Sequence, residues 1–194
     1  LAKAQAELGV IPKDKADTIC KYADASLLDL PSIGEFYKSS ITIVPLLKAF
    51  KAVLPDNAGE FVHWGATSQD IVDTGMVLQQ REAWRVIVRD MKLCLGHCLE
   101  LARKYRNTPM AGRTHVVHAI PITFGYKAAV WADEIGREIE RLEAMADRVF
   151  VGEMGGAVGT LASQPAQGLA TPKRMMGILG RKVPTISWRV ANNR

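Results

Sequence analysis

Apolar residues recur every three or four positions along the middle of the chain, and this spacing predicts a long helix. The stripe starts after Gln69, and after one step of seven residues its spacing alternates between four and three. Its members are Val77, Trp84, Val88, Met91, Leu95, Cys98, Ala102 and Tyr105. Because an α-helix turns once every 3.6 residues or so, this spacing places all of them on one face, which would form an apolar seam.

A second stripe predicts a second long helix further along the chain. Pro121 lies near its first turn, and glycines follow Val151, where the pattern ends. The stripe consists of Trp131, Ile135, Ile139, Leu142, Ala146 and Val149. Shorter helical patterns cover residues 1–8, 14–25, 42–53 and 171–179, and Gly180 directly after the last one is typical of a helix end. We find no alternating pattern that predicts a strand.

The two long helices indicate the fold class and a need for partners. Each would contain about 30 residues and measure about 45 Å. Since this chain supplies so few long helices, their stripes need partners from further sequence or other subunits, and we expect an obligate oligomer. The sequence therefore predicts an all-α, long-helix bundle that is incomplete in this chain. Residues 1–66 would form an N-terminal helical domain truncated at its start, and residues 67–194 the first part of a central bundle.

Composition and charge narrow the class of protein. The 194 residues are 48% hydrophobic and 23% charged, which excludes a disordered chain. The 25 Lys and Arg exceed the 20 Asp and Glu by only five and are interleaved with acids, so we expect no nucleic-acid partner. Polar side chains interrupt the longest uncharged stretch, residues 154–172, so no membrane span is expected. Three cysteines without a secretory signal favour the cytoplasm.

The first segment that could carry chemistry is His-Trp-Gly-Ala-Thr-Ser-Gln-Asp at residues 63–70, where the first long helix begins. Thr67 and Asp70 have the spacing of a capping box, in which the hydroxyl and the carboxylate each bind a free backbone N–H of the first turn. A simple helix cap would explain these two residues. It would not require His63, Gly65 and two successive hydroxyls, and a helix N-terminus is also a ready anion site.

The second segment is Gly-Arg-Thr-His-Val-Val-His-Ala-Ile-Pro at residues 112–121, directly before the second long helix. Arg113 and Thr114 would suit a bound carboxylate, and His115 would suit a proton transfer because imidazole titrates near neutrality. A polar loop between helices is the alternative. Two such segments, each with His and Thr at the start of a long helix, favour convergence in one pocket. His118 is assigned to structure.

Cofactor and metal sites are not expected. The glycine-rich segment at residues 152–160 lacks the G-x-G-x-x-G order and follows a helix, so we interpret its glycines as a turn or a close approach of helices. Cys94, His97 and Cys98 are close in sequence, but three ligands do not complete a structural zinc site. Glu60 and His63 have the spacing of a di-iron motif, which occurs once where two copies are needed.

These segments resemble the fumarase/aspartase superfamily, in the branch that contains 3-carboxy-cis,cis-muconate cycloisomerase and adenylosuccinate lyase. Residues 63–74 resemble its first signature region and residues 112–125 its second. Residues 155–160 resemble the start of a later bundle helix. The resemblance spans about residues 35–188, with similar order and spacing.

The resemblance implies an all-α homotetramer whose active sites each draw residues from three subunits. The implied reaction is anti elimination or addition on a succinate-like polycarboxylate, without a metal or organic cofactor. Thr67 and Ser68 would hold a substrate carboxylate with help from Thr114, and His115 would be the general acid. His63 would be a second catalytic candidate that makes a further polar contact. The remaining pocket residues would be Gln69 and Asp70, which shape it.

The family's usual base is a serine in a run of the form Ser-Ser-x-Met-Pro-x-Lys-x-Asn-Pro, and no such run occurs before Arg194. We therefore expect the base beyond residue 194 and expect this stretch alone to be inactive. A non-catalytic helical scaffold is the alternative if the complete protein also lacks the base.

The resemblance also bears on the substrate. Residues 39–44 lack the His-Asp pair usual in adenylosuccinate lyases, and residues 184–188 look more like the muconate branch. Val117, Arg189, Asn192 and Asn193 depart from that branch's pattern. The favoured function is a cycloisomerase of this kind, and the alternative is a carbon–nitrogen lyase that releases fumarate.

Overall fold

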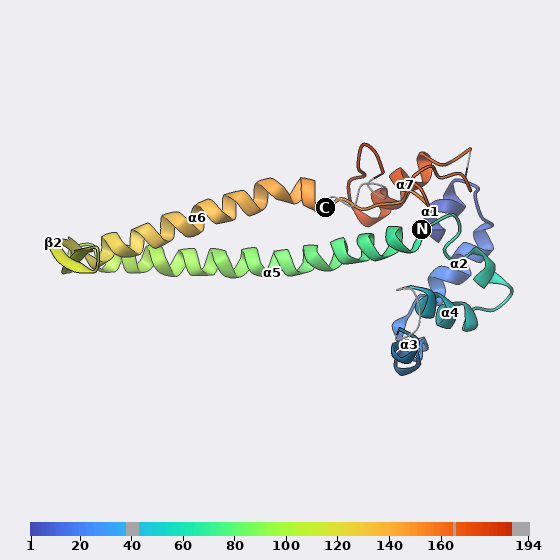
Figure 1. The fold of residues 1–194 in the computed structure, drawn as a ribbon, viewed down its shortest axis with the longest axis horizontal. Coiled ribbons are helices and arrows are strands. Elements are labelled where there is room, and N and C mark those ends of the chain that lie inside the picture. The colour runs from blue at the N-terminus through green and yellow to red at the C-terminus, as the bar shows by residue number, and fades with distance from the viewer. Residues whose placement is uncertain (38–42, 165, 188–194) are drawn as a thin grey trace. The chain divides into compact units, whose positions relative to one another are not determined.

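The computed structural model describes residues 1–37, 43–164 and 166–187, and these form a mostly helical fold with one small sheet (Figure 1). The mostly helical fold confirms the predicted class. The α-helices are α1 (Ala2–Glu7), α2 (Lys13–Lys21), α3 (Leu30–Tyr37), α4 (Val44–Ala52), α5 (Ser68–Lys104), α6 (Phe124–Val149) and α7 (Ala170–Leu179). Two short 3-10 helices, η1 (Ala25–Leu27) and η2 (Ala58–Phe61), and the strands β1 (Pro109–Thr114) and β2 (Val117–Thr123) complete the list.

The chain divides into two compact units. The first comprises Leu1–Leu78 and the described residues from Phe150 onward, and the second comprises Gln79–Val149. Helix α5 runs from the first unit into the second. The predicted division between residues 66 and 67 concerns the domains of a complete bundle and stays a prediction.

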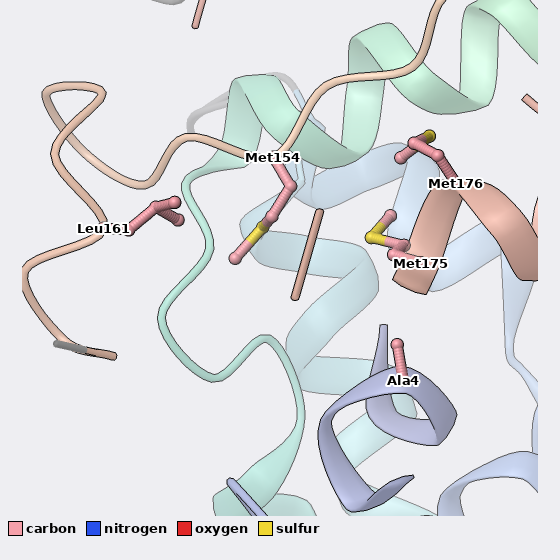
Figure 2. Packing of buried hydrophobic residues seen from close by; sticks show 5 residues of the cluster. All are labelled: Ala4, Met154, Leu161, Met175 and Met176. Carbon is pink, nitrogen blue, oxygen red and sulfur yellow. The ribbon is translucent and has the colours of Figure 1, made fainter. Parts of the chain in front are cut away.

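The core of the first unit joins segments that are far apart in the sequence. Its main cluster consists of Ala4, Met154, Leu161, Met175 and Met176, all less than one tenth exposed. Figure 2 shows Ala4 on α1, the methionine pair on α7, and Met154 and Leu161 on the segment that follows α6. A second cluster contains Ile19, Ala58 and Val62. Helix α7 ends at Gly180 in the left-handed conformation, as its sequence predicts.

The second unit consists of the later part of α5, the hairpin β1–β2, and α6 (Figure 1). Tyr105 packs edge-to-face on Phe124 with ring centroids 5.3 Å apart. Nearer the end of α6, Lys92 Nζ of α5 donates to Glu143 Oε1 of α6 at 2.7 Å. The two helices therefore run antiparallel. Val88, Cys98, Ala128, Ala132 and Ile139 are buried along the two helices. Both long helices predicted from the apolar stripes are confirmed.

The hairpin corrects the expectation that the chain contains no strand. Residues Pro109–Thr114 pair antiparallel with Val117–Thr123, and Thr114 lies opposite Val117. Pro121 consequently lies in β2 and not in the first turn of a helix, since α6 begins at Phe124. Most side chains of the hairpin are exposed. Because neither face is buried, the sequence carries no alternation of apolar and polar residues that would reveal the strands.

The glycine-rich segment after α6 corrects a second expectation, that residues 155–160 start a bundle helix. Residues 152–164 follow an irregular path with turns, and the next helix is α7 at Ala170, so residues 155–160 do not start a bundle helix. Gly156 and Gly159 adopt positive φ angles of 73° and 79°, which a right-handed helix does not allow. The interpretation of these glycines as a turn is correct.

Residues 39–42, Trp188, Arg189, Asn192 and Asn193, on which part of the substrate interpretation depends, lie outside the described residues. Within the described ranges, none of the helices combines the length and the apolar character needed to cross a bilayer.

Candidate active site

The carboxylate of Asp70 organises the start of α5. The side chain is 0% exposed, and both of its oxygens accept hydrogen bonds from backbone N–H groups. Oδ2 accepts from Thr67 and from Gly156, and Oδ1 accepts from Gly155, each at 2.9 Å. The bond to Thr67 confirms the carboxylate half of the predicted capping box. The other two bonds reach more than 80 residues along the chain, to the glycine-rich segment.

The turn that precedes α5 lies tightly against this same segment. Gly65 has a φ of 67°, and a Cβ atom there would lie 2.4 Å from Gln164 Nε2 and 2.7 Å from Ser163 Oγ. Any other residue would have to displace these two side chains and would be strained at this positive φ, so the position favours glycine. The carbonyl oxygen of Trp64 accepts from Gln164 Nε2 at 3.3 Å and from Gln5 Nε2 at 2.8 Å. The turn is therefore held by α1 as well as by the segment after α6.

Thr67 and Ser68, the predicted carboxylate-binding residues, are half-buried at the first turn of α5. Gln69 is exposed, and its amide nitrogen donates to the carboxylate of Asp73. The positive end of the helix dipole lies at this turn, so two hydroxyls and a helix N-terminus are combined in one place. This combination suits an anion. Asp70, by contrast, presents no accessible surface, and its carboxylate holds the turn through the hydrogen bond to the N–H of Thr67.

His63, at the start of the same turn, has a strained backbone conformation. Its φ is 66°, which is uncommon for a residue with a Cβ atom, and its Nδ1 is buried without a hydrogen-bond partner. The residue lines a largely apolar cavity of about 350 Å³ together with residues such as Val62 and Ile71. Burial lowers the pKa of His63, and the charge of Lys51 acts in the same direction while that of Asp70 opposes it.

The lowered pKa of His63 predicts a pH dependence of stability. The unfolded histidine binds a proton near its ordinary pKa of 6.5, whereas the folded one resists protonation until a lower pH. The unfolded state therefore binds more protons, and the stability present above pH 6.5 falls as the pH drops from there through the folded pKa. We expect the denaturation midpoint of the wild type to fall more than that of His63→Gln between about pH 7.5 and about pH 5. Parallel curves for the two proteins would contradict this prediction.

The second predicted group occupies the tip of the hairpin. Arg113, Thr114 and His115 are all exposed there. His115 and Val116 form the two-residue loop, with φ angles of 46° and 66°. Positive φ at both positions is typical of a type I′ turn, which normally contains Asn and Gly. A β-branched valine in this conformation is strained, and such strain is found most often at functional sites.

Comparison with known proteins agrees with the motifs. A family model described as a lyase matches residues 1–171. The chain belongs to the fumarase/aspartase superfamily. It is 45% identical over its whole length to N-acetyl-S-(2-succino)cysteine lyase from Enterococcus italicus, and 42% identical over 98% of its length to adenylosuccinate lyase from Methanocaldococcus jannaschii. It spans 43% and 41% of these two relatives, which is less than half of each.

A solved structure of the superfamily has a closely similar fold. The β-carboxy-cis,cis-muconate cycloisomerase from Acinetobacter calcoaceticus sp. ADP1 superimposes with a TM-score of 0.93 at 35% identity. The match covers 96% of this chain and 45% of that one. The predicted superfamily is thus confirmed, and with it the branch whose members include muconate cycloisomerase and adenylosuccinate lyase. The three relatives described above are named after three different substrates.

Within this superfamily member, the predicted site residues fall into two groups in different units. His63, Thr67, Ser68, Gln69 and Asp70 belong to the first unit, and Arg113, Thr114 and His115 belong to the second. The first group is held by contacts within its own unit, which include the glycine-rich segment, and the second group lies at the tip of the hairpin. The expected convergence of both groups in one pocket stays a prediction, as do the roles of the individual residues.

Sequence reasoning missed the contribution of the glycine-rich segment. The segment follows α6 in the chain, yet its backbone supplies two of the three donors to Asp70. The sequence shows only an acid in the first turn of a predicted helix and, far away, glycines that fit no known motif, and neither feature identifies the other as its partner. Of the cysteines considered as metal ligands, Cys98 is buried and Cys94 is exposed. Among the described residues, no group of three or more His, Cys, Asp or Glu is placed to hold a metal ion.

Proposed function

We propose that the complete protein is a lyase or cycloisomerase that acts on a succinate-like polycarboxylate by anti elimination or by its reverse, addition. The observation that carries this proposal is the start of α5, where the hydroxyls of Thr67 and Ser68 adjoin the helix N-terminus and the buried Asp70 holds the turn. Such a site suits a carboxylate. The names of the relatives, a succinocysteine lyase and an adenylosuccinate lyase, support a substituted succinate as the substrate class.

The residues of the site have distinct roles in this reaction. Thr67 and Ser68 would hold a carboxylate of the bound substrate. Removal of the proton beside that carboxylate places more negative charge on it, and the same two residues would stabilise this charge as it develops. Arg113 and Thr114 would bind the carboxylate from the hairpin. His115 would protonate the leaving group as general acid, and His63 would make a further polar contact. The base would come from sequence beyond residue 194, and the proposed chemistry uses no cofactor.

The proposal includes a homotetramer with active sites shared between subunits. The two groups of site residues flank α5, which is 37 residues long, so different subunits would supply them. Large apolar side chains are exposed along both long helices and provide surface for such an assembly. On α5 these are Met76, Val86, Ile87, Leu93 and Leu99, and on α6 they are Tyr126, Val130, Trp131, Met145 and Val149. The proposed compartment is the cytoplasm.

Three compounds are candidate substrates for the proposed reaction. The motifs favour 3-carboxy-cis,cis-muconate, and the cycloisomerase structure at 35% identity is in keeping with it. The relative that is 45% identical adds N-acetyl-S-(2-succino)cysteine, in which the bond to break joins carbon to sulfur. Adenylosuccinate represents the carbon–nitrogen alternative. In all three reactions a proton is removed from, or in the addition to the muconate delivered to, a carbon beside a carboxylate, so the proposed carboxylate-binding roles of Thr67 and Ser68 apply to each. The proposed role of His115 as the acid for a leaving group applies to the two eliminations and to the reverse of the cycloisomerisation.

An ultraviolet assay of the complete protein against these three compounds tests the proposal. Each reaction gains or loses a conjugated double bond, so one detection method serves for all. We expect turnover of one substrate and little of the others. Turnover of the muconate would support the cycloisomerase, and fumarate release from a substituted succinate would support a lyase. A complete protein that turns over no member of an extended panel of substituted succinates would favour the non-catalytic scaffold.

A further inference from the structure

We propose that Asp70 and Thr74 form a clamp that holds the backbone of residues 153–156 against the first turns of α5, and that this clamp positions Thr67 and Ser68 for a substrate carboxylate. The proposal rests on the function proposed above. It assigns Asp70 to positioning instead of to direct contact with substrate, and it gives Thr74 and the glycine-rich segment a role in the same site.

The first half of the clamp is the carboxylate of Asp70. Three backbone N–H groups, from Thr67, Gly155 and Gly156, point at its two oxygens at 2.9 Å. Hydrogen bonds from N–H groups to an ionised carboxylate are roughly twice as strong as neutral ones, and burial strengthens them further. Since the side chain is completely buried, its oxygens are not available to a ligand. What Asp70 contributes is the link between the helix start and the distant segment.

The second half is Thr74, one helical turn further along. Its hydroxyl donates to the carbonyl oxygen of Glu153 and accepts from the N–H of the same residue, both at 2.9 Å. Residues four apart lie on one face of a helix, so Asp70 and Thr74 both face the segment. Thr74 binds the backbone of Glu153, and Asp70 binds the backbone of Gly155 and Gly156. Thr74 is 3% exposed. The segment is therefore attached to α5 at two successive points.

The clamped segment in turn supports the turn that carries the hydroxyls. A Cβ atom on Gly156 would lie 3.2 Å from the carbonyl oxygen of Gly65, so the two backbones are nearly in contact. The same carboxylate oxygen of Asp70 binds both Gly156 and Thr67. A shift of the segment would therefore move Thr67 directly. Misplacement of a binding group by about 1 Å can cost up to about 100-fold in catalytic efficiency.

Asp70→Asn in the complete protein tests the clamp, with Asp90→Asn as the matched control. Both substitutions remove a carboxylate from α5, but Asp90 is exposed and pairs with its neighbour Arg89. Asparagine at position 70 replaces one carboxylate oxygen by an NH₂ group. This group cannot accept a hydrogen bond from the backbone N–H that the oxygen bound. We expect hydrogen exchange of the peptide spanning residues 152–158 to rise about tenfold or more in Asp70→Asn and to stay at the wild-type rate in Asp90→Asn.

The kinetic readout separates positioning from a purely structural role. We expect Asp70→Asn to raise KM at least about tenfold for the substrate identified in the ultraviolet assay, with a smaller change in kcat, because carboxylate binding is impaired more than proton transfer. Thr74→Val keeps the side-chain shape and loses both bonds to Glu153, so it should change exchange and KM in the same direction. If Asp70→Asn fails to fold, Thr74→Val alone decides the question.

Exchange at the wild-type rate in both clamp variants would overturn the proposal. Faster exchange with an unchanged KM would also overturn it, because the segment would then be held without positioning the site. A wild-type protein that turns over no substrate would contradict the proposed function, and the binding constant for fumarate would then replace KM. In that case weaker fumarate binding in the variants would support the clamp, and unchanged or undetectable binding would overturn its positioning role.

Discussion

Replacing His115 with alanine in the complete protein is expected to lower kcat about 100-fold or more, because a general acid typically contributes 10²- to 10⁴-fold to the rate. The imidazole stands at the exposed tip of the hairpin, in a two-residue loop whose φ angles are both positive. Because the side chain is exposed in this chain, truncating it removes little packing here. The loss should therefore fall on turnover and leave the denaturation midpoint close to that of the wild type.

His118→Ala is the matched control for this experiment. It removes a second exposed imidazole from the same hairpin, three residues further along, and we assign that histidine no chemical role. Steady-state kinetics of both variants on the same substrate give the comparison. Equal turnover of His115→Ala and wild type would refute the assignment of the acid. An equal loss in both variants would instead point to damage of the hairpin as a whole.

The largest effect on stability is expected from Gly125→Ala. A Cβ atom on Gly125 would lie 2.5 Å from Arg106 Cα and 2.6 Å from both Arg106 N and Ala102 O. These are backbone atoms, so a side-chain rotation cannot relieve the contact and the start of α6 must move away from the end of α5. Overpacking of this kind costs about 1–3 kcal/mol. We expect the free energy of unfolding to fall by about 2–3 kcal/mol, measured by denaturant titration.

Gly136→Ala on the same helix should act in the opposite direction. A Cβ atom at Gly136 would meet no described atom within 4 Å, and alanine favours a helix interior over glycine by about 1 kcal/mol. The same chemical change thus predicts destabilisation at the start of α6 and a small stabilisation in its middle. Destabilisation by both variants to a similar degree would show that the close approach of Gly125 to α5 is not the cause.

The candidate site was predictable where its contacts are local. The spacing of Thr67 and Asp70 indicates a capped helix start, and the hydrogen bond between them is present. The partners of Asp70 in the glycine-rich segment lie 85 and 86 residues away, and no local pattern encodes such a pairing. The conformation of His115 was equally hidden, because a His-Val pair does not have the composition of a type I′ turn.

The sequence by itself determined the long helices, the superfamily and the identities of the candidate residues. It could do so because helical periodicity and helix caps depend on residues only a few positions apart. Only the tertiary structure decided that residues 109–123 form a hairpin and that the glycine-rich segment supports the start of α5. It also decided that both carboxylate oxygens of Asp70 accept hydrogen bonds from backbone N–H groups. Strand pairing and the satisfaction of a buried carboxylate both depend on which distant backbones meet, and that is settled when the chain packs.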